Sequence, residues 1–209
     1  MRILLLSPHT DDIELGAGGT LIKLLEDKSN DICWVVFSIC EDAVPQGLPA
    51  DTLEKEFTAV ASKLGIKNYR INRFPNKNFP QDRQRILDQL DKVKREFKPD
   101  LVVSPSLNDS HQDHKTIAEE AVRAFKKEAS IIGYELPWNN LVFSPQLTVK
   151  LTEGQMEAKW EVLSIYKSQF TLQRNYFSKE LIFGWARMRG VQGSFEYAEA
   201  FEVVRWIIR

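Results

Sequence analysis

The 209-residue chain contains three histidines, and each of them lies close to aspartates. His9 belongs to the segment SPHTDDIELGAGGT (7–20), and His111 and His114 belong to NDSHQDHKT (108–116). Both segments follow an apolar run that is typical of a buried strand. Ligands of open parallel sheets bind beyond the carboxyl ends of the strands. We therefore expect the two segments, although far apart in the sequence, to meet in one crevice.

The types and spacing of these residues suit a divalent metal ion. His111 and His114 are three positions apart, so at the start of a helix they share one face. Two imidazoles and one carboxylate are a common ligand set of a catalytic metal, usually zinc, and leave room for water and substrate. Asp11 and Asp12 are adjacent and cannot point the same way in an extended chain. One can bind the ion while the other takes a proton from water, which predicts metal-assisted hydrolysis.

Strand-like and helix-like segments alternate along most of the chain. The expected strands are 2–8, 31–39, 67–74, 100–106 and 130–137. The expected helices are 18–28, 52–65, 81–97 and 111–129. Beyond these, the pattern weakens to strands at 146–152 and 201–209 around one helix at 154–169. Strand and helix in alternation indicate a parallel sheet covered on both faces. We expect one α/β domain over residues 1–209, with a Rossmann-like open, mostly parallel sheet, helices on both faces and a C-terminal elaboration that contains strands.

The bulk composition is that of an ordinary globular protein, with 43% hydrophobic and 27% charged residues. A net charge of −1 gives no electrostatic reason to expect nucleic acid or an anionic membrane as a partner. Cys33 and Cys40 are too few for a disulfide framework and suit a reducing compartment as buried thiols. We find neither a signal-peptide core nor a membrane span. We expect a cytoplasmic protein with a small-molecule partner, and a homo-oligomer is compatible with the sequence.

The two histidine segments together resemble the PIG-L/LmbE-like N-acetylglucosaminyl deacetylases. The shared pattern is Pro-His, one residue, Asp-Asp, a glycine-rich stretch with Gly-Gly-Thr, and later His-x-Asp-His. Further similar segments are LGI (64–66), KPDLVVSPSLNDSHQDH (98–114), YELPWN (134–139), YKSQ (166–169) and YAEAF (197–201). The resemblance covers most of the chain. It implies a zinc-dependent hydrolase, with Fe²⁺ as an alternative ion, that removes the acetyl group from an N-acetylglucosamine-type sugar or conjugate.

The resemblance also implies a role for individual residues. The metal ligands fall on His9, Asp12 and His114. The general base falls on Asp11. His111 steadies the oxyanion or protonates the leaving amine, and Asp113 is expected to pair with His111 and hold its tautomer. Asp113 as a plain helix N-terminal charge is the alternative.

Three positions depart from the common family pattern. Thr10 and Gln112 stand where many members have proline, and neither position is required to contact the metal. Ile13 separates the Asp-Asp pair from Glu14. This last arrangement resembles the subgroup that contains bacillithiol-type deacetylases, which does not assign the substrate.

The glycine cluster GAGGT (16–20) does not match the dinucleotide fingerprint, because Leu21 occupies the position of its last glycine. We expect Gly16, Gly18 and Gly19 to let the start of the helix pack closely against the site. A phosphate-binding loop is the alternative.

Substrate contacts are less evident from the sequence. Trp138 is a candidate for stacking on a sugar ring. Arg83, Arg85 and Arg189 are candidates for holding the sugar by hydrogen bonds. Packing for the tryptophan and plain surface charge for the arginines are the alternatives.

Other functions are compatible with the same residues. One is a related metal hydrolase that acts on a different N-acyl substrate, such as an N-acyl cyclic amine or another amino-sugar conjugate. Another is a Rossmann-like nucleotide-binding module without hydrolytic chemistry. A degenerate, non-catalytic scaffold is disfavoured, because every expected metal and base position is filled.

Overall fold

The computed structural model describes residues 1–208, and its strands form a mixed sheet in the order β3-β2-β1-β4-β5-β7-β6. The strands are β1 (Arg2–Ser7), β2 (Asp31–Val36), β3 (Tyr69–Ile71), β4 (Leu101–Pro105), β5 (Ser130–Tyr134), β6 (Leu147–Leu151) and β7 (Tyr197–Arg205). Strands β1 to β5 are parallel to one another, whereas β7 is antiparallel to both of its neighbours, β5 and β6. The expected α/β class and mostly parallel sheet are confirmed.

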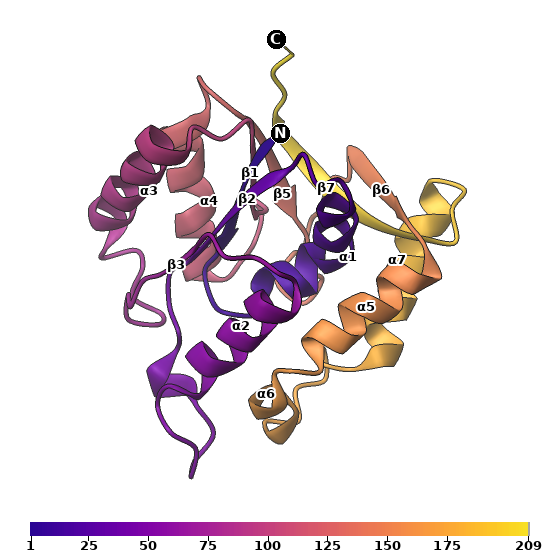
Figure 1. Cartoon of the computed structure of the whole chain (residues 1–209), viewed down its shortest axis with the longest axis horizontal. Coiled ribbons are helices and arrows are strands. Elements are labelled where there is room, and N and C mark those ends of the chain that lie inside the picture. The colour runs from indigo at the N-terminus through magenta and orange to yellow at the C-terminus, as the bar shows by residue number, and fades with distance from the viewer. Residues whose placement is uncertain (209) are drawn as a thin grey trace.

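Helices cover both faces of the sheet (Figure 1). They are α1 (Asp12–Glu26), α2 (Thr52–Lys63), α3 (Arg83–Phe97), α4 (Gln112–Phe125), α5 (Glu153–Leu163), α6 (Lys167–Thr171) and α7 (Lys179–Gln192), with a 3₁₀ turn, η1 (Glu41–Ala43). Successive side chains of a strand point to opposite faces. Ile3 and Leu5 of β1 therefore join the core under α1, α2, α5 and α7, and Leu4 and Leu6 join the core under α3 and α4.

The order of the strands places a crevice beside the centre of the sheet. β1 pairs with β2 on one side and with β4 on the other. The chain leaves β1 toward α1 on one face and leaves β4 toward α4 on the opposite face. Ligands of doubly wound sheets bind at such a switch point, beyond the carboxyl ends of the two strands. His9 follows β1 there, and His111 follows β4.

The start of α1 differs from the expected helix at 18–28. The helix begins at Asp12 and ends at Glu26, so the glycine cluster lies inside it and forms no phosphate-binding loop. Ala17 has non-helical dihedral angles (φ −143°, ψ 15°), and the helix is kinked there. A Cβ at Gly16 would lie 2.4 Å from a ring carbon of Tyr134 in β5. Close packing of the glycines is therefore confirmed, but the neighbours are β5 and the C-terminal elaboration.

The C-terminal elaboration contains more structure than the sequence predicted. Besides β6, β7 and α5, it includes the 14-residue α7, which the sequence analysis missed. The single helix expected at 154–169 ends at Leu163, and the short α6 follows it as a separate helix. Trp185 of α7 is buried, whereas Leu181, Met188 and Val191 are exposed. Because apolar residues lie on both the buried and the exposed side of α7, the sequence lacks the hydrophobic periodicity that identifies an amphipathic helix.

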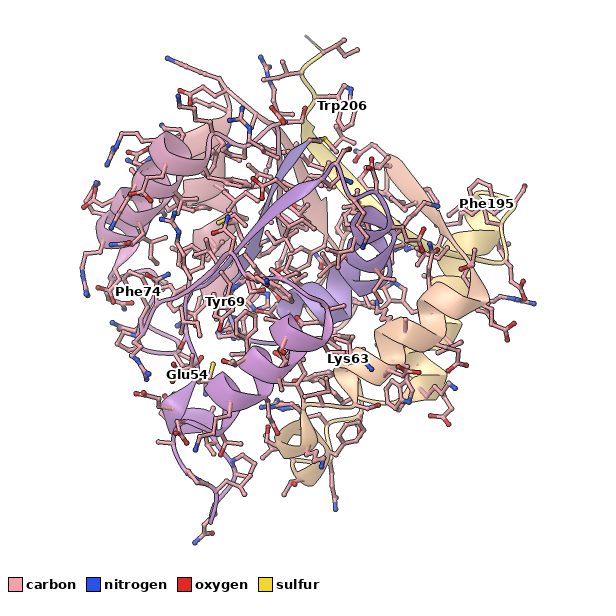
Figure 2. All side chains as sticks on the ribbon, in the orientation of Figure 1. Glu54, Lys63, Tyr69, Phe74, Phe195 and Trp206 are labelled. Carbon is pink, nitrogen blue, oxygen red and sulfur yellow. The ribbon has the colours of Figure 1, made fainter. Side chains whose placement is uncertain are left out.

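The elaboration packs beside α2 as well as α1. Figure 2 shows Lys63, the last residue of α2, next to α5, where its amine lies 3.0 Å from the Glu161 carboxylate. The Glu56 carboxylate of α2 accepts hydrogen bonds from the hydroxyl and the N–H of Ser168 in α6, at 2.6 and 2.9 Å. Cys33 and Cys40 are buried free thiols, as expected. Among the described residues, no helix has the length and apolar character to cross a bilayer.

Candidate metal and catalytic site

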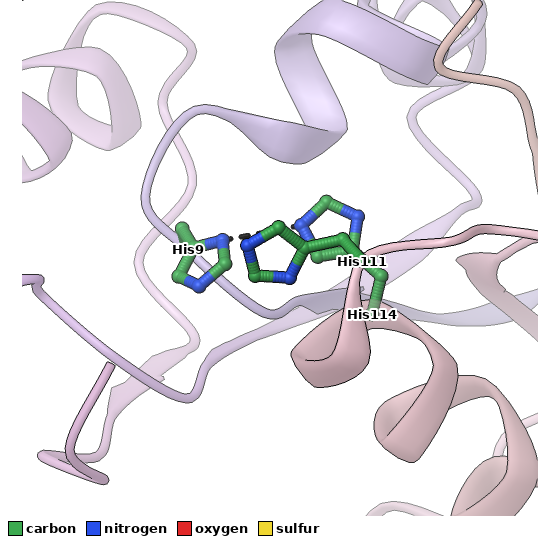
Figure 3. Close-up of side chains that lie close together, drawn as sticks. All are labelled: His9, His111 and His114. Carbon is green, nitrogen blue, oxygen red and sulfur yellow. Dashed lines mark hydrogen bonds between the residues drawn. The ribbon is translucent and has the colours of Figure 1, made fainter. Parts of the chain in front are cut away.

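The three histidines meet at the carboxyl ends of β1 and β4 (Figure 3). Their ring centroids are 5.1 Å apart for His9 and His111, 4.6 Å for His111 and His114, and 5.1 Å for His9 and His114. One ring nitrogen from each lies within 4.8 Å of the others. His111 is the N-cap of α4 and His114 lies in its first turn. The expected convergence of the two segments is present.

Three ligand atoms from the expected metal set converge most closely. His9 Nδ1 lies 3.2 Å from His114 Nε2. Asp12 Oδ2 lies 3.2 Å from His9 Nδ1 and 3.4 Å from His114 Nε2. Atoms that bind one zinc ion tetrahedrally at 2.0–2.1 Å are about 3.3 Å apart. The backbone N–H of His9 donates to the same Asp12 oxygen at 2.7 Å, which fixes the oxygen beside the rings. The three separations fit one small cation.

A carboxylate lies behind each of the two imidazoles that are expected to bind the metal. His114 Nδ1 donates to Asp109 Oδ2 at 2.8 Å, and His9 Nε2 donates to Asp113 Oδ2 at 3.2 Å. An ionised carboxylate only accepts, so each of these ring nitrogens carries the hydrogen. When the rings are neutral, the opposite nitrogens, His9 Nδ1 and His114 Nε2, then direct lone pairs toward Asp12. Three electron-pair donors face one another, and only a cation or an added proton makes that arrangement favourable.

Asp113 corrects an expectation from the sequence, because its carboxylate pairs with His9 and not with His111. The backbone N–H groups of Lys77 and Phe79 donate to it at 2.7 and 3.3 Å and hold it against His9. Burial alone raises the pKa of Asp113, but the hydrogen bonds from His9 and from these N–H groups bring it below its usual range. Its partner loop is 36 residues away in sequence, which local spacing cannot reveal.

His111 uses its side chain to cap α4. Its Nδ1 accepts the backbone N–H of Asp113 at 3.2 Å, so the hydrogen of the neutral ring is on Nε2. Burial, with the neighbouring His114 and His9, lowers the pKa of His111 to about 4. His111 lines the cavity described below and presents a neutral donor there.

Asp109 is a site residue that the sequence analysis missed. It is 2% exposed, and besides His114 it accepts the backbone N–H of His111 at 2.8 Å. Its signal in the sequence was an aspartate two positions before the first histidine of NDSHQDHKT. Such an aspartate is equally typical of a turn.

The two adjacent aspartates have different surroundings. Asp12 starts α1, and although burial raises its pKa, His114 and His9 lower it to about 2. Asp11 precedes the helix and lines the cavity. Burial and the charge of Asp12 raise the pKa of Asp11 to about 6, against the opposing effects of His9 and Arg174. Neighbouring carboxyl groups with separated pKa values indicate separate roles in catalysis.

The hydroxyl of Tyr166 braces the backbone between His9 and Asp11. It lies 2.6 Å from the Thr10 carbonyl and 2.6 Å from Glu14 Oε1. A hydroxyl has one hydrogen, so the second contact requires a hydrogen from the Glu14 carboxyl. Burial raises the pKa of Glu14 well above its usual value, in agreement with a neutral carboxyl group. Tyr166, the first residue of the YKSQ segment, thus stabilises the backbone that carries His9 and Asp11.

A cavity of about 330 Å³ opens in front of the histidines. Its lining also includes Trp138, Asn139, Asn76, Lys77, Gln169, Arg174 and Tyr176. The face of Trp138 stacks on Tyr176, with centroids 4.3 Å apart and planes at 14°. Trp138 therefore reaches the cavity, although Tyr176 covers one of its faces.

The three candidate arginines from the sequence do not line this cavity. Arg83 pairs with Glu119 and Glu120, Arg85 with Asp82, and Arg189 with Glu135. The arginine that does line it is Arg174, in the loop after α6. Its Nε is buried and has no hydrogen-bond partner among the described residues. No periodicity or motif around Arg174 marked it in the sequence.

Comparisons with known proteins identify the family of this chain. The model of the PIG-L family, described as GlcNAc-PI de-N-acetylase, matches residues 4–125. The chain belongs to the PIG-L family. The curated "uncharacterized deacetylase YaiS" of Escherichia coli (strain K12) is 27% identical over 170 residues, 79% of this chain and 90% of that protein. The resemblance inferred from the sequence is confirmed.

Solved structures share the fold of this PIG-L family chain. The N,N'-diacetylchitobiose deacetylase of Pyrococcus horikoshii has a TM-score of 0.81 at 21% identity, over 97% of this chain and 83% of that one. GalB, the 4-carboxy-2-hydroxymuconate hydratase of Pseudomonas putida KT2440, has a TM-score of 0.78 at 21% identity, over 100% and 98%. A deacetylase and a hydratase thus share the architecture, so the reaction must be argued from the side chains.

Proposed function

We propose that this PIG-L family chain is a metal-dependent amide hydrolase that removes the acetyl group from an N-acetylglucosamine-type sugar or conjugate. The observation that carries the proposal is the convergence of His9 Nδ1, Asp12 Oδ2 and His114 Nε2 within 3.4 Å of one another. The hydrogen-bonded carboxylates behind both rings support it, because they orient the lone pairs toward a common point.

The donor set suits Zn²⁺, and Fe²⁺ accepts the same nitrogen and oxygen ligands. His9, Asp12 and His114 would hold the ion. A bound divalent ion lowers the pKa of water and polarises a carbonyl group, which is the chemistry that amide hydrolysis needs.

Asp11 is the base of the proposed reaction. Its carboxylate lines the cavity without serving in the three-atom cluster, and its pKa of about 6 lies close to neutral pH. A base with such a pKa is ionised at neutral pH and still holds a transferred proton well. Asp11 takes the proton of the attacking water and then delivers it to the nitrogen of the leaving amine.

His111 is the donor for the oxygen of the substrate carbonyl. The sequence left two roles open, oxyanion stabilisation and protonation of the amine. The N–H of Asp113 occupies His111 Nδ1, and the lowered pKa keeps the ring neutral. A neutral Nε2–H stabilises a developing oxyanion by a hydrogen bond and has no spare proton to give the amine.

The cavity supports a small polar substrate. Its volume of about 330 Å³ is at the lower end of ligand pockets. The exposed part of Trp138 and the guanidinium group of Arg174, both in the cavity lining, are the proposed sugar contacts, in place of the three arginines outside the cavity. We also propose that residues 1–209 form one domain, since the sheet takes strands from Arg2 to Arg205.

Metal analysis followed by product assays tests the proposal. The purified protein is loaded with one equivalent of Zn²⁺ or Fe²⁺ and incubated with N-acetylated sugars, sugar conjugates and N-acyl amines. Acetate release from the sugars, lost in Asp11→Asn, is the expected result. Release from N-acyl amines alone would assign the other hydrolase activity, and loaded protein that releases no acid from any amide would refute both.

A further inference from the structure

The glycine cluster and the YAEAF segment meet at the break in α1. In a regular helix the N–H of Gly19 donates to the carbonyl of Leu15, four residues earlier. At this break each group has a partner from the C-terminal elaboration. Lys159 Nζ of α5 donates to the Leu15 carbonyl at 2.7 Å. The N–H of Gly19 donates to Glu199 Oε1 of β7 at 2.8 Å.

Lys159 and Glu199 also bind each other. Lys159 Nζ lies 2.7 Å from Glu199 Oε1, and the two side chains are 2% and 4% exposed. The other carboxylate oxygen, Oε2, accepts the N–H of Thr20 at 2.7 Å. The buried ion pair is therefore inserted into the helix between a carbonyl and an N–H that regular geometry would join directly.

The signs of the two charges match the two ends at the break. The ammonium group lies at the carboxyl end of the first segment, and the carboxylate lies at the amino end of the second. Each opposes the partial charge that a helix end carries. Removing one partner of a buried pair leaves an uncompensated charge, so both are needed.

The glycines give this pair access to the backbone. A Cβ at Gly19 would lie 3.2 Å from Glu199 Oε1 and 2.4 Å from a methyl carbon of Leu151. A Cβ at Gly18 would lie 3.2 Å from Lys159 Cγ. Glycine at these two positions allows side chains of α5, β6 and β7 to reach the helix.

The first segment of α1 carries the chemistry of the site. It runs from Asp12 to the break at Ala17 and is shorter than two turns. A helical piece of that length has no stable direction of its own. Asp11 precedes it, and Asp12 must keep its oxygen 3.4 Å from His114 Nε2.

We infer that Lys159 and Glu199 are positioning residues, whose ion pair across the break sets the direction of the turn that bears Asp11 and Asp12. Neither side chain is hydrogen-bonded to the histidines or is itself part of the cavity lining, and Lys159 contacts the lining residue Leu15 through its backbone carbonyl. The inference assigns a function to the C-terminal elaboration, which holds the two aspartates in register with the histidines of α4.

The test compares Glu199→Gln with Glu157→Gln. Glu157 lies in the same α5 as Lys159, and its exposed pair with Lys179 at 2.7 Å is the matched control. We expect Glu199→Gln to fold, to bind Zn²⁺ at least about tenfold more weakly and to lose at least about tenfold in kcat with KM little changed. Glu157→Gln should stay within about twofold of the wild type in all three quantities.

A crystal structure of metal-free Glu199→Gln supplies a readout that needs neither metal nor substrate. We expect the separation of Asp12 Oδ2 from His114 Nε2 to exceed the 3.4 Å of the wild type. An unchanged separation, or a folded variant with wild-type zinc affinity that has lost only thermal stability, would overturn the inference. If Glu199→Gln does not fold, Glu199→Asp keeps the charge but shortens its reach, and wild-type zinc affinity in that variant would overturn the inference equally.

The kcat measurement rests on the proposed function, whereas the zinc affinity and the Asp12–His114 separation do not. If the wild-type enzyme releases no acetate, the proposed function fails while zinc affinity and the Asp12–His114 separation still decide the role of the pair. If those two quantities are unchanged in an enzyme whose wild type is active, the role of the pair fails while the proposed function stands.

Discussion

Replacing Asp109 by asparagine changes one hydrogen bond behind the site and leaves every expected ligand in place. Asp109 is 2% exposed, and its Oδ2 accepts from His114 Nδ1 at 2.8 Å. Its Oδ1 accepts the backbone N–H of His111 at 2.8 Å. Because that N–H cannot turn away, the asparagine oxygen must take the Oδ1 position, and its NH₂ then faces His114.

The new donor favours the wrong tautomer of His114. Nδ1 must accept from the amide, so the hydrogen moves to Nε2, the nitrogen that faces His9 and Asp12. Loss of a partner behind a metal ligand typically weakens metal binding by about 10- to 100-fold. Each tenfold is about 1.4 kcal/mol, so we expect a loss of about 1.4–2.8 kcal/mol in zinc binding.

Competition with a chromophoric chelator measures the zinc affinity of Asp109→Asn and of the wild type. Urea unfolding of the two metal-free proteins shows whether each of them folds. Asp82→Asn is the matched control, because Asp82 is a largely buried aspartate that pairs with Arg85 away from the histidines. We expect the control to stay within about twofold of the wild type. A folded Asp109→Asn that binds zinc as tightly as the wild type would refute the reasoning about the tautomer of His114.

Further predictions concern the base, the substrate contact and the ion. Asp11→Asn should keep its zinc and lose at least about 100-fold in kcat, and full turnover would remove Asp11 from the role of base. Arg174→Ala should raise KM at unchanged zinc content, whereas Arg83→Ala, outside the cavity, should not, and equal KM values would contradict the assignment. A chelator should abolish turnover and lower the midpoint of unfolding. Relative to protein with free metal at about 1,000 times Kd, removal of the metal should lower the free energy of unfolding by about 4 kcal/mol. An unchanged midpoint would contradict a metal bound by the folded chain.

Local sequence patterns were sufficient to predict those features of the site that depend on a single segment of the chain. The apolar runs before His9 and His111 predicted strands, and the strand order brings their carboxyl ends together. The spacing of His111 and His114 predicted a shared helix face, and both belong to the start of α4. These inferences need only the chain on either side of each residue.

Partners from distant segments were beyond prediction. Asp113 is two positions from His111 and 104 positions from His9 in the sequence, yet the N–H groups of Lys77 and Phe79 hold its carboxylate against His9. The same holds for the beginning of α1. Glycines at 16, 18 and 19 are poor helix formers, and the expected helix began only at residue 18, six residues after the observed start at Asp12. Lys159 and Glu199 bind the backbone groups at the break and stabilise the helix in spite of its composition.

The charges around the histidines explain why a cation is favoured at the site. α1 and α4 both point their amino ends toward it, and helix amino ends carry partial positive charge. The carboxyl groups of Asp11, Asp12, Asp109 and Asp113 face that region, and among residues 1–208 none of the four forms an ion pair with a lysine or arginine. Helix ends alone cannot balance so many carboxylates. A divalent cation between the three donor atoms would supply the missing charge. Without Asp109 and Asp113, the rings of His9 and His114 would lose the hydrogen bonds that orient them toward such a cation.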